Sequence, residues 1–496
     1  MDSGSHIVTC RTTPALGPQP YSLAVPARPR RRYPLVLCLH GFGGRCWQWS
    51  ARDLRWASAL GVVLAGPDGY GNQHFDGLGE DDVLAVLDDV SRRLPIDADR
   101  VYLHGGSMGG HGALRLAWRY PHRFAAVSAV AGWISAEQWY AKWYAAPGEW
   151  QPPPAVAPLV EAASPYGWRG AARFVATRLA YGTADDINEP EDTEWLLAEL
   201  ANDGLQASGQ VQAERVPGGG HGAGGSWPSV LRFLLRHRRR WPTAHRSATL
   251  RHADLGWLRV DRRADPLAPV ELSARWSAGQ AEVELSNAAE VAIEPAVGPP
   301  ALRRGAVAMT VNGQLLAPIE PGGRATLTLE AQPGPLAKRR GTDGGPGELF
   351  RAPFAIIAPE RGEQRAAAEA FAGDWDAWFC CRGGERISPP PSLLGAPGDS
   401  GHLLVWGGLA DHPWLRRWAD WPEPLGARPT PDGIELAGER FAADRWGWQV
   451  LHPLPWQPER LVLLCHGYHQ SPVDAEQTPW AVGQDLESLP WRAPDA

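Results

Sequence analysis

Residues 101–114 read VYLHGGSMGGHGAL, and the chemistry of the N-terminal half depends on how this stretch folds. Its first residues form an apolar run that predicts a buried strand, and residues 108–120 predict a helix. Between them stands the pattern Gly-x-Ser-x-Gly, which occurs once in the chain. Its glycines allow a tight turn that lifts the hydroxyl of Ser107 above the sheet. We therefore predict Ser107 as a nucleophile; the alternative is a glycine-rich turn with a structural role.

A serine nucleophile needs a general base and a group that orients this base. In a strand–turn–helix architecture, both follow the serine, the acid before the histidine, each directly after a later strand. Asp185 follows the apolar run at 174–182, and His221 directly follows the predicted strand at 211–220, in a glycine-rich loop. We therefore predict Asp185 as the orienting acid and His221 as the base.

Neighbouring residues offer alternatives for each of these roles. Asp186 could replace Asp185 as the acid, or Asp185 could cap the following helix. His221 could be an ordinary loop histidine. His104 and His111 flank the serine, but the first lies in the predicted strand and the second in the predicted helix. We interpret both as structural neighbours of the turn.

A negatively charged oxygen that forms during acyl transfer needs two backbone N–H donors. One should come from Met108, directly after the nucleophile. The other should come from the exit of the first predicted strand, HGFGG at 40–44. We predict Phe42 as this second donor, with Gly43 as the alternative. The same glycines could serve only the turn.

Predicted strands and helices alternate along the first 240 residues. This pattern is typical of an α/β fold with a doubly wound, mostly parallel sheet that helices cover on both faces. The predicted strands are 35–41, 61–69, 100–106, 124–132, 174–182 and 211–220, and the predicted helices are 80–94, 108–120, 191–204 and 228–240.

The pattern changes near residue 246. Residues from about 255 to 331 alternate apolar and polar side chains between turn residues, which predicts antiparallel strands in a β-sandwich. A Gly/Pro-rich loop or linker at 333–350 precedes further strand–helix units, which predict a small α/β region. We therefore expect three domains, at 1–245, 246–332 and 333–496.

Two nearly identical stretches, LVLCLHG at 35–41 and LVLLCHG at 461–467, raise the question of a duplicated catalytic module. No Gly-x-Ser-x-Gly follows the second stretch. Buried parallel strands favour Leu and Val, so two such runs arise easily without duplication. We interpret His466 and His469 as structural.

Composition narrows the class of protein. The chain has 496 residues, a net charge of −7 and no basic stripe with interleaved aromatic residues, so we expect no nucleic-acid partner. Its six cysteines and its histidines show no structural-zinc spacing, and we expect no metal and no organic cofactor. The apolar runs are too short to span a membrane. No signal peptide is visible, so we expect a cytoplasmic protein as written, or a secreted one if the N-terminus is truncated.

Tryptophan is abundant, with 25 residues. Several lie in an insertion at 133–170, between two predicted strands, where a lid over the nucleophile could form. We predict that an apolar or aromatic acyl group is bound there by Trp139, Trp143, Tyr144 and Trp150. The equally weighted alternative is that these side chains pack the insertion onto the body of the protein.

The motifs HGFGG, GGSMGG, GTADDIN and GGGHG together resemble those of the α/β-hydrolase superfamily. Over residues 20–240, the chain is similar to bacterial esterases of the prolyl-oligopeptidase, polyhydroxybutyrate-depolymerase and feruloyl-esterase type. The resemblance implies Ser107, Asp185 and His221 as a catalytic triad. The acid region ADDINEP departs from the single Asp of many relatives, which leaves Asp186 open. The C-terminal half resembles accessory regions of multidomain relatives and implies no function.

These observations predict a serine hydrolase that cleaves carboxylic esters through an acyl-enzyme. Its substrate would be a feruloyl, acetyl-sugar or polyester-type ester, aromatic, polysaccharide-linked or polymeric. One alternative is a serine peptidase of the prolyl-oligopeptidase type, although a preceding β-propeller is not evident. Another is a carbohydrate- or partner-binding role for the C-terminal half. A third is acyl transfer to an acceptor other than water. The sequence does not fix the oligomeric state.

Overall fold

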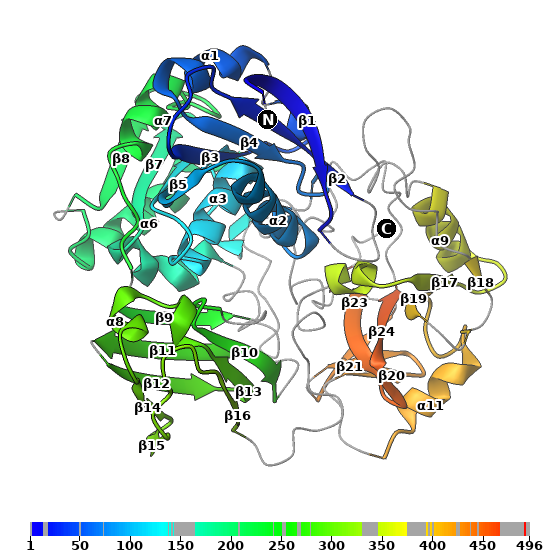
Figure 1. Cartoon of the computed structure of the whole chain (residues 1–496). Helices are drawn as coiled ribbons and strands as arrows, with labels where there is room; N and C mark the ends of the chain where they lie inside the picture. The colour runs from blue at the N-terminus through cyan, green and yellow to red at the C-terminus, as the bar shows by residue number, and fades with distance from the viewer. Residues whose placement is uncertain are drawn as a thin grey trace.

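Figure 1 shows the computed structural model of the chain. The structure describes residues 2–12, 18–48, 51–72, 74–136, 138–139, 142, 164–206, 209–241, 243–249, 254–264, 269–277, 279–329, 346–373, 393–394, 397–398, 401–422, 427–436, 438–443, 446–466 and 491–492.

The N-terminal region is built on one sheet, drawn from blue to green in Figure 1. Its strand order is β1-β2-β4-β3-β5-β6-β7-β8. Strands β3 to β8 run parallel, whereas β1 and β2 are antiparallel additions at one edge. The bounds are Gly4–Cys10, Gln19–Val25, Tyr33–Leu39, Val63–Pro67, Ile96–Gly106, Ala126–Val130, Ala176–Gly182 and Val211–Val216. The predicted α/β class and mostly parallel sheet are confirmed, while β1 and β2 were not predicted.

Helices cover both faces of this sheet, as in a doubly wound fold. One face packs into a core with α2, α3, η2 and α6, and the other packs against α7 and the partly buried Trp56 of α1. The helices are η1 Cys46–Gln48, α1 Ala51–Leu60, α2 Leu78–Arg93, α3 Met108–Arg119, η2 Pro165–Arg173, α6 Pro190–Asn202 and α7 Trp227–Leu234.

The predicted helix at 228–240 is wrong at its C-terminal end, because α7 stops at Leu234. Beyond it, Arg239 donates to the carboxylate of Asp99 and to the carbonyl oxygen of His122. Residues 237–241 lie outside any helix or strand, so these tertiary contacts take precedence over the helical propensity of the arginines.

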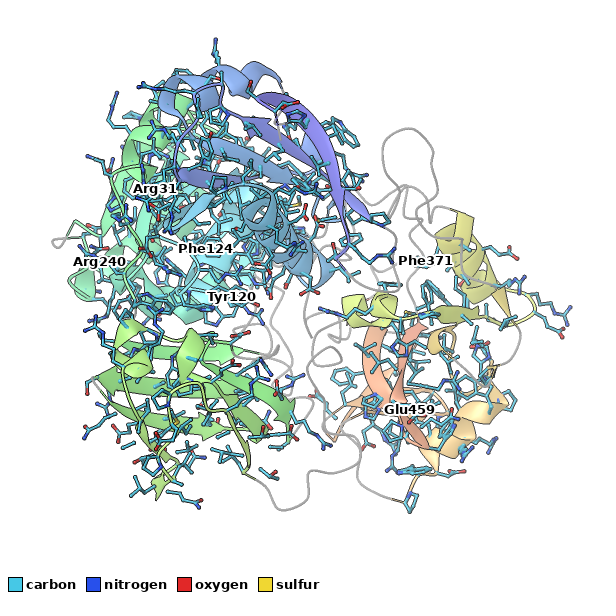
Figure 2. The ribbon with its side chains drawn as sticks, viewed as in Figure 1. Arg31, Tyr120, Phe124, Arg240, Phe371 and Glu459 are labelled. Atoms are coloured by element: carbon cyan, nitrogen blue, oxygen red, sulfur yellow. The ribbon has the colours of Figure 1, made fainter. Side chains whose placement is uncertain are left out.

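A buried cluster of charges joins α2 to α3. Arg115 forms an ion pair with Asp76, and Arg119 lies 3.1 Å from Glu80. The hydroxyl of Tyr120, labelled in Figure 2, donates to Glu80 at 2.5 Å. All of these side chains are almost fully buried. Burial raises the pKa of Asp76, and the charge of Arg115 opposes this rise.

Arg115→Met should destabilise the N-terminal region by about 3–5 kcal/mol, because it leaves buried Asp76 without its cation. Hydrogen exchange of the α3 amides, followed by mass spectrometry, would measure this loss. Arg123→Met is the matched control. The partner of Arg123, Asp88, is 54% exposed, so the control should cost less than about 1 kcal/mol. Equal protection in the two variants would contradict the prediction.

The middle region is a β-sandwich. Strands in the order β15-β14-β12-β11-β9 form one sheet, β10-β13-β16 form another, and both contribute side chains to one hydrophobic core. At Asn287, with φ 51°, the chain passes from β12 in one sheet to β13 in the other. The strands are Ala244–Thr249, Leu258–Arg263, Val270–Ser277, Gln280–Ser286, Ala288–Ile293, Ala308–Val311, Gln314–Leu315 and Ala325–Thr328, with η3 Pro295–Val297 and α8 Pro300–Arg303.

Two details of the predicted sandwich are wrong. The first strand begins at Ala244, earlier than predicted, and β12 pairs with β14 in parallel. The parallel pair arises because β13 lies in the other sheet, so that β14 returns beside β12 in the same direction.

The C-terminal region has a mixed sheet in the order β18-β17-β19-β24-β23-β25. β17, β18, β19 and β24 are parallel, and β23 is antiparallel. The predicted small α/β region is confirmed. A second sheet, β20-β21-β22, was not predicted. The elements are η4 Pro346–Arg351, β17 Phe354–Ile357, α9 Glu363–Gly373, β18 Leu393–Leu394, β19 His402–Trp406, η5 Pro413–Leu415, α11 Arg416–Ala419, β20 Ala427–Thr430, β21 Gly433–Leu436, β22 Glu439–Ala442, β23 Trp446–Leu454, β24 Gln457–His466 and β25 Trp491–Arg492.

The predicted linker at 333–350 is wrong in its described part. Residues 346–351 form the 3₁₀ helix η4, and its Leu349 and Phe350 are buried. Their apolar side chains enter a core, which a solvated linker would not provide. Among the described residues, no helix has the length and apolar character needed to cross a membrane.

Candidate active site

Ser107 stands in a strained backbone conformation at the carboxyl end of β5. Its φ is 56° and its ψ is −124°, a region that non-glycine residues rarely adopt. Its N–H donates to the carbonyl oxygen of Val130, 2.8 Å away, at the end of β6. A side chain at Gly105 would lie 2.1 Å from the carbonyl oxygen of Gly109, and one at Gly109 would lie 2.2 Å from that of Leu39. The turn is therefore possible only with glycine at both positions.

Asp185 and His221 are in direct contact. Nδ1 of His221 lies 2.9 Å and 3.0 Å from the two carboxylate oxygens of Asp185. The same carboxylate accepts the backbone N–H groups of Ile187 and Asn188, each at 3.0 Å. Its side chain is fully buried, whereas Asp186 is exposed. Nδ1 is thus occupied by the acid, which leaves Nε2 of the ring to exchange protons.

The sheet places Ser107 at the same edge as this pair. Ser107 follows β5, Asp185 follows β7 and His221 follows β8. The strands are in parallel register, with Gly106 opposite Val130 and Val130 opposite Ala180. The carboxyl ends of parallel strands meet at one edge of a sheet, which is where such folds bind ligands.

Buried Arg178 ties the histidine loop to the sheet. From β7, its guanidinium donates to the carbonyl oxygen of Gly224 at 2.5 Å and to Glu214 at 2.6 Å. It also donates to Ser128 on β6 at 2.8 Å. The other side of the loop is held where the N–H of Ala184 donates to the carbonyl oxygen of Gly219. His221 therefore lies in a loop fixed to the protein on both sides.

The HGFGG loop lies beside Ser107. A Cβ built on Gly41 would lie 3.8 Å from the Cβ of Ser107. The N–H of Gly43 already donates to Oδ1 of Asn72 at 2.7 Å, so Phe42 is the better candidate for an oxyanion donor. Met108 is the first residue of α3, so its N–H has no acceptor within the helix.

His104 and His111 lie inside the protein. Nδ1 of His104 is 3.0 Å from the carbonyl oxygen of Ser128, and that of His111 is 3.2 Å from the carbonyl oxygen of Trp133. Burial lowers the pKa of His104 to about 4 and that of His111 well below its ordinary value. Both rings are therefore neutral, weak bases, and the Nδ1 atom of each faces a backbone carbonyl oxygen.

Comparison with known proteins agrees with this geometry. Residues 65–238 match the sequence profile of the Prolyl oligopeptidase family. A stretch of 130 residues is 35% identical to "Putative esterase NocK" of Nocardia uniformis subsp. tsuyamanensis, and covers 22% of this chain and 36% of that protein. Residues 65–238 thus resemble serine hydrolases of the α/β-hydrolase fold, and we call the N-terminal region the hydrolase domain. This family includes both esterases and peptidases.

Two further relatives extend the comparison. A stretch of 159 residues is 28% identical to dipeptidyl-peptidase 5 of Porphyromonas gingivalis, and covers 27% of this chain and 23% of that protein. The solved structure of FphF, a fluorophosphonate-binding serine hydrolase of Staphylococcus aureus, aligns with 45% of this chain and 92% of its own. That alignment has 18% identity and a TM-score of 0.36. The chain thus spans about a third or less of the length of the curated relatives it matches.

The aromatic residues proposed to bind the acyl group are placed only in part. Trp143, Tyr144 and Trp150 lie outside the described residues. Trp139 is half-buried, stacks on Trp133 with ring centroids 5.5 Å apart, and meets His74 edge-on at 5.2 Å. These contacts suit packing of the insertion as well as they suit a wall of an acyl site.

Sequence reasoning missed Asn72 and Arg178. Asn72 lies in a glycine-rich loop without a motif, and Arg178 is one charge inside an apolar strand. A buried strand with an arginine needs partners, so Arg178 did carry a readable signal. No group of acidic, histidine or cysteine side chains in the described part of the hydrolase domain could hold a metal ion.

Asp185→Asn should lower kcat by about 10⁴-fold, because an amide no longer holds the tautomer of His221 that leaves Nε2 basic. Asp186→Asn is the matched control, since Asp186 is exposed and only its carbonyl oxygen accepts a contact that the structure describes, from Lys142. It should change kcat by less than about twofold. Steady-state ester hydrolysis measures both. A large loss in the control with little loss in Asp185→Asn would reverse the assignment.

Arg178→Met should lower kcat by about 10- to 100-fold, because the loop that carries His221 loses its anchor at Gly224. Ser128→Ala removes another partner of Arg178 without touching the loop, and should keep kcat within about twofold. The rate of labelling by a fluorophosphonate reports the same change at the nucleophile. A folded Arg178→Met protein that is labelled at the normal rate would show that the anchor is dispensable.

Proposed function

We propose that the protein hydrolyses carboxylic esters through an acyl-enzyme on Ser107. The observation that carries this proposal is the contact of buried Asp185 with the partly exposed His221, at the strand edge where Ser107 stands in a strained turn. His221 removes the proton of the Ser107 hydroxyl as its oxygen attacks the acyl carbonyl. Asp185 stabilises the cationic imidazole that results.

The charge on the tetrahedral oxygen is stabilised by backbone donors. We assign these to the N–H groups of Met108 and Phe42. Collapse of the intermediate releases the alcohol, which takes its proton from His221. Water, activated by the same imidazole, then attacks the acyl-enzyme and restores Ser107. These reaction steps use only water and the residues named above.

Two observations favour an esterase over a peptidase: one similarity to a known protein, and the sheets that follow the hydrolase domain. The 35% identity over 130 residues to NocK of Nocardia uniformis, which is named an esterase, supports this choice. The sheets described outside the hydrolase domain form a sandwich, a mixed sheet and one three-stranded sheet, and none of them builds the repeated four-stranded blades of a propeller. Peptidase activity remains the second candidate, because the matching profile is that of the Prolyl oligopeptidase family. Feruloyl, acetyl-sugar and hydroxyalkanoate esters all suit this chemistry, since the shape of the pocket sets selectivity.

Ser107→Ala should abolish hydrolysis of p-nitrophenyl esters and covalent labelling by a fluorophosphonate, because the attacking oxygen is gone. Mass spectrometry of the labelled wild-type protein should place the label on Ser107. A label on another serine would refute the assignment. A panel that pairs each ester with the corresponding aminoacyl or prolyl amide then separates the two activities, and faster amide cleavage would favour the peptidase.

A further inference from the structure

The loop at 68–77, between β4 and α2, is strained at several positions. Tyr70, His74 and Phe75 have φ values of 55°, 49° and 57°, although none of them is glycine. Each such residue costs on the order of 1–3 kcal/mol and persists only where its surroundings enforce it. Strain of this kind is concentrated at functional sites, which directs attention to the contacts of the loop.

On its inner side, the loop holds the HGFGG segment beside Ser107. Oδ1 of Asn72 accepts the N–H of Gly43 at 2.7 Å, and the carbonyl oxygen of Asp68 lies 2.8 Å from Nε2 of His40. The carboxylate of Asp68 also accepts three hydrogen bonds from the Nε and Nη2 atoms of Arg45. The position of the proposed oxyanion donor Phe42 thus depends on a loop that is not part of the catalytic residues.

Phe75 connects the same loop to the nucleophile helix. Its ring meets His40 edge-on, with centroids 5.0 Å apart. A Cβ added at Gly69 or at Gly112 of α3 would lie 2.5 Å and 2.9 Å from the nearest atom of this ring. The ring therefore fills the space between the loop, the HGFGG segment and α3. A shift of the loop would displace both the HGFGG segment and α3.

On its outer side, the loop packs against the C-terminal region. Tyr70 and Leu78 belong to one continuous hydrophobic cluster with Leu349 and Phe350 of η4. The cluster continues through residues of β17, α9, β19, β23 and β24, including Phe371, which Figure 2 labels. Next to it, Arg351 of η4 forms an ion pair with Asp81 of α2. Figure 1 shows the yellow-green η4 beside α2.

We propose that the C-terminal α/β region is a positioning element for the oxyanion segment, which acts through Tyr70 and the strained loop. This inference rests on the proposed function of Ser107. It gives the C-terminal half a role other than carbohydrate or partner binding. Phe350 and Tyr70 are positioning residues, since neither touches the reacting atoms. Burial of Tyr70 in the cluster that also contains Phe350 offsets the strain of the loop, and the loop in turn fixes Phe42.

The test compares two phenylalanines on opposite faces of one sheet in the full-length protein. Phe350 lies in the cluster that contains Tyr70, and Phe441 lies in the cluster on the other face of β24. They are 6% and 2% exposed, so Phe→Ala removes a similar buried ring at each position. Both variants are assayed well below their unfolding temperatures.

Phe350→Ala should lower kcat by about 2- to 30-fold with little change in KM, because an oxyanion donor acts in the transition state. The affinity for a trifluoromethyl ketone, which forms a tetrahedral adduct with serine, should fall by the same factor as kcat/KM. Amide exchange at 69–77 should quicken. Phe441→Ala should leave kcat, inhibitor affinity and this exchange unchanged, and Phe350→Leu should restore most of the loss.

Unchanged exchange at 69–77 in Phe350→Ala overturns the proposal, and so does quicker exchange with unchanged kcat. An equal loss of kcat in Phe441→Ala overturns it as well. If Phe350→Ala does not fold, Arg351→Gln removes the neighbouring ion pair and should show a smaller effect in the same direction. Failure of the proposed function is seen separately, because Ser107→Ala would then retain activity while the exchange measurements still report on the loop.

Discussion

The backbone conformation of Ser107 is the constraint on which the rest of the hydrolase domain depends. A non-glycine residue at φ 56° costs on the order of 1–3 kcal/mol, which must be offset by its surroundings. The hydrogen bond to Val130 fixes β6 against the turn, and the close approach of Gly109 to Leu39 fixes α3 against β3. The strands β3, β5 and β6 are therefore held so that their carboxyl ends lie at the same edge of the sheet. An acid and a histidine that follow later strands can meet at this edge.

Much of this arrangement could be predicted because its signals are local. Glycines around a serine and apolar runs of strand length can be recognised from adjacent residues, and the acid and the histidine follow such runs. The choice between Asp185 and Asp186 could not be made in this way, because both occupy the same short loop. Burial separates them, since only Asp185 turns inward to three N–H donors. Likewise, α7 stops at Leu234 because Arg239 finds a partner 140 residues away in Asp99.

The loop at 68–77 shows a deeper limit of sequence reasoning. Left-handed backbone is expected at glycine, and Gly69, Gly71 and Gly77 meet that expectation. Tyr70 and Phe75 also have left-handed backbone, although the intrinsic preferences of these residue types do not favour it. Their conformations follow from where their rings are buried, which is a tertiary property that involves α3 and a region 280 residues later in the chain. Such positions are where local propensity and the fold disagree, and they are typical of functional sites.

The nearly identical stretches at 35–41 and 461–467 illustrate how one type of strand serves two purposes. Both lie inside a sheet: β3 lies between β4 and β5, which are parallel to it, and β24 lies between parallel β19 and antiparallel β23. The first leads into the oxyanion segment. In the second, alternation divides the side chains: Leu461, Leu463 and Cys465 join the cluster that contains Tyr70, and Val462 and Leu464 join the opposite one. A buried strand thus specifies a sheet and its two faces, whereas its chemistry depends on what lies beyond its carboxyl end. The inner face of β24 belongs to the cluster that covers the loop, and the loop contacts the end of β3 through His40. The two strands are therefore alike because both are buried inside a sheet. The loop at 68–77 connects them physically, since it contacts His40 after β3 and places Tyr70 in the cluster that contains β24 residues.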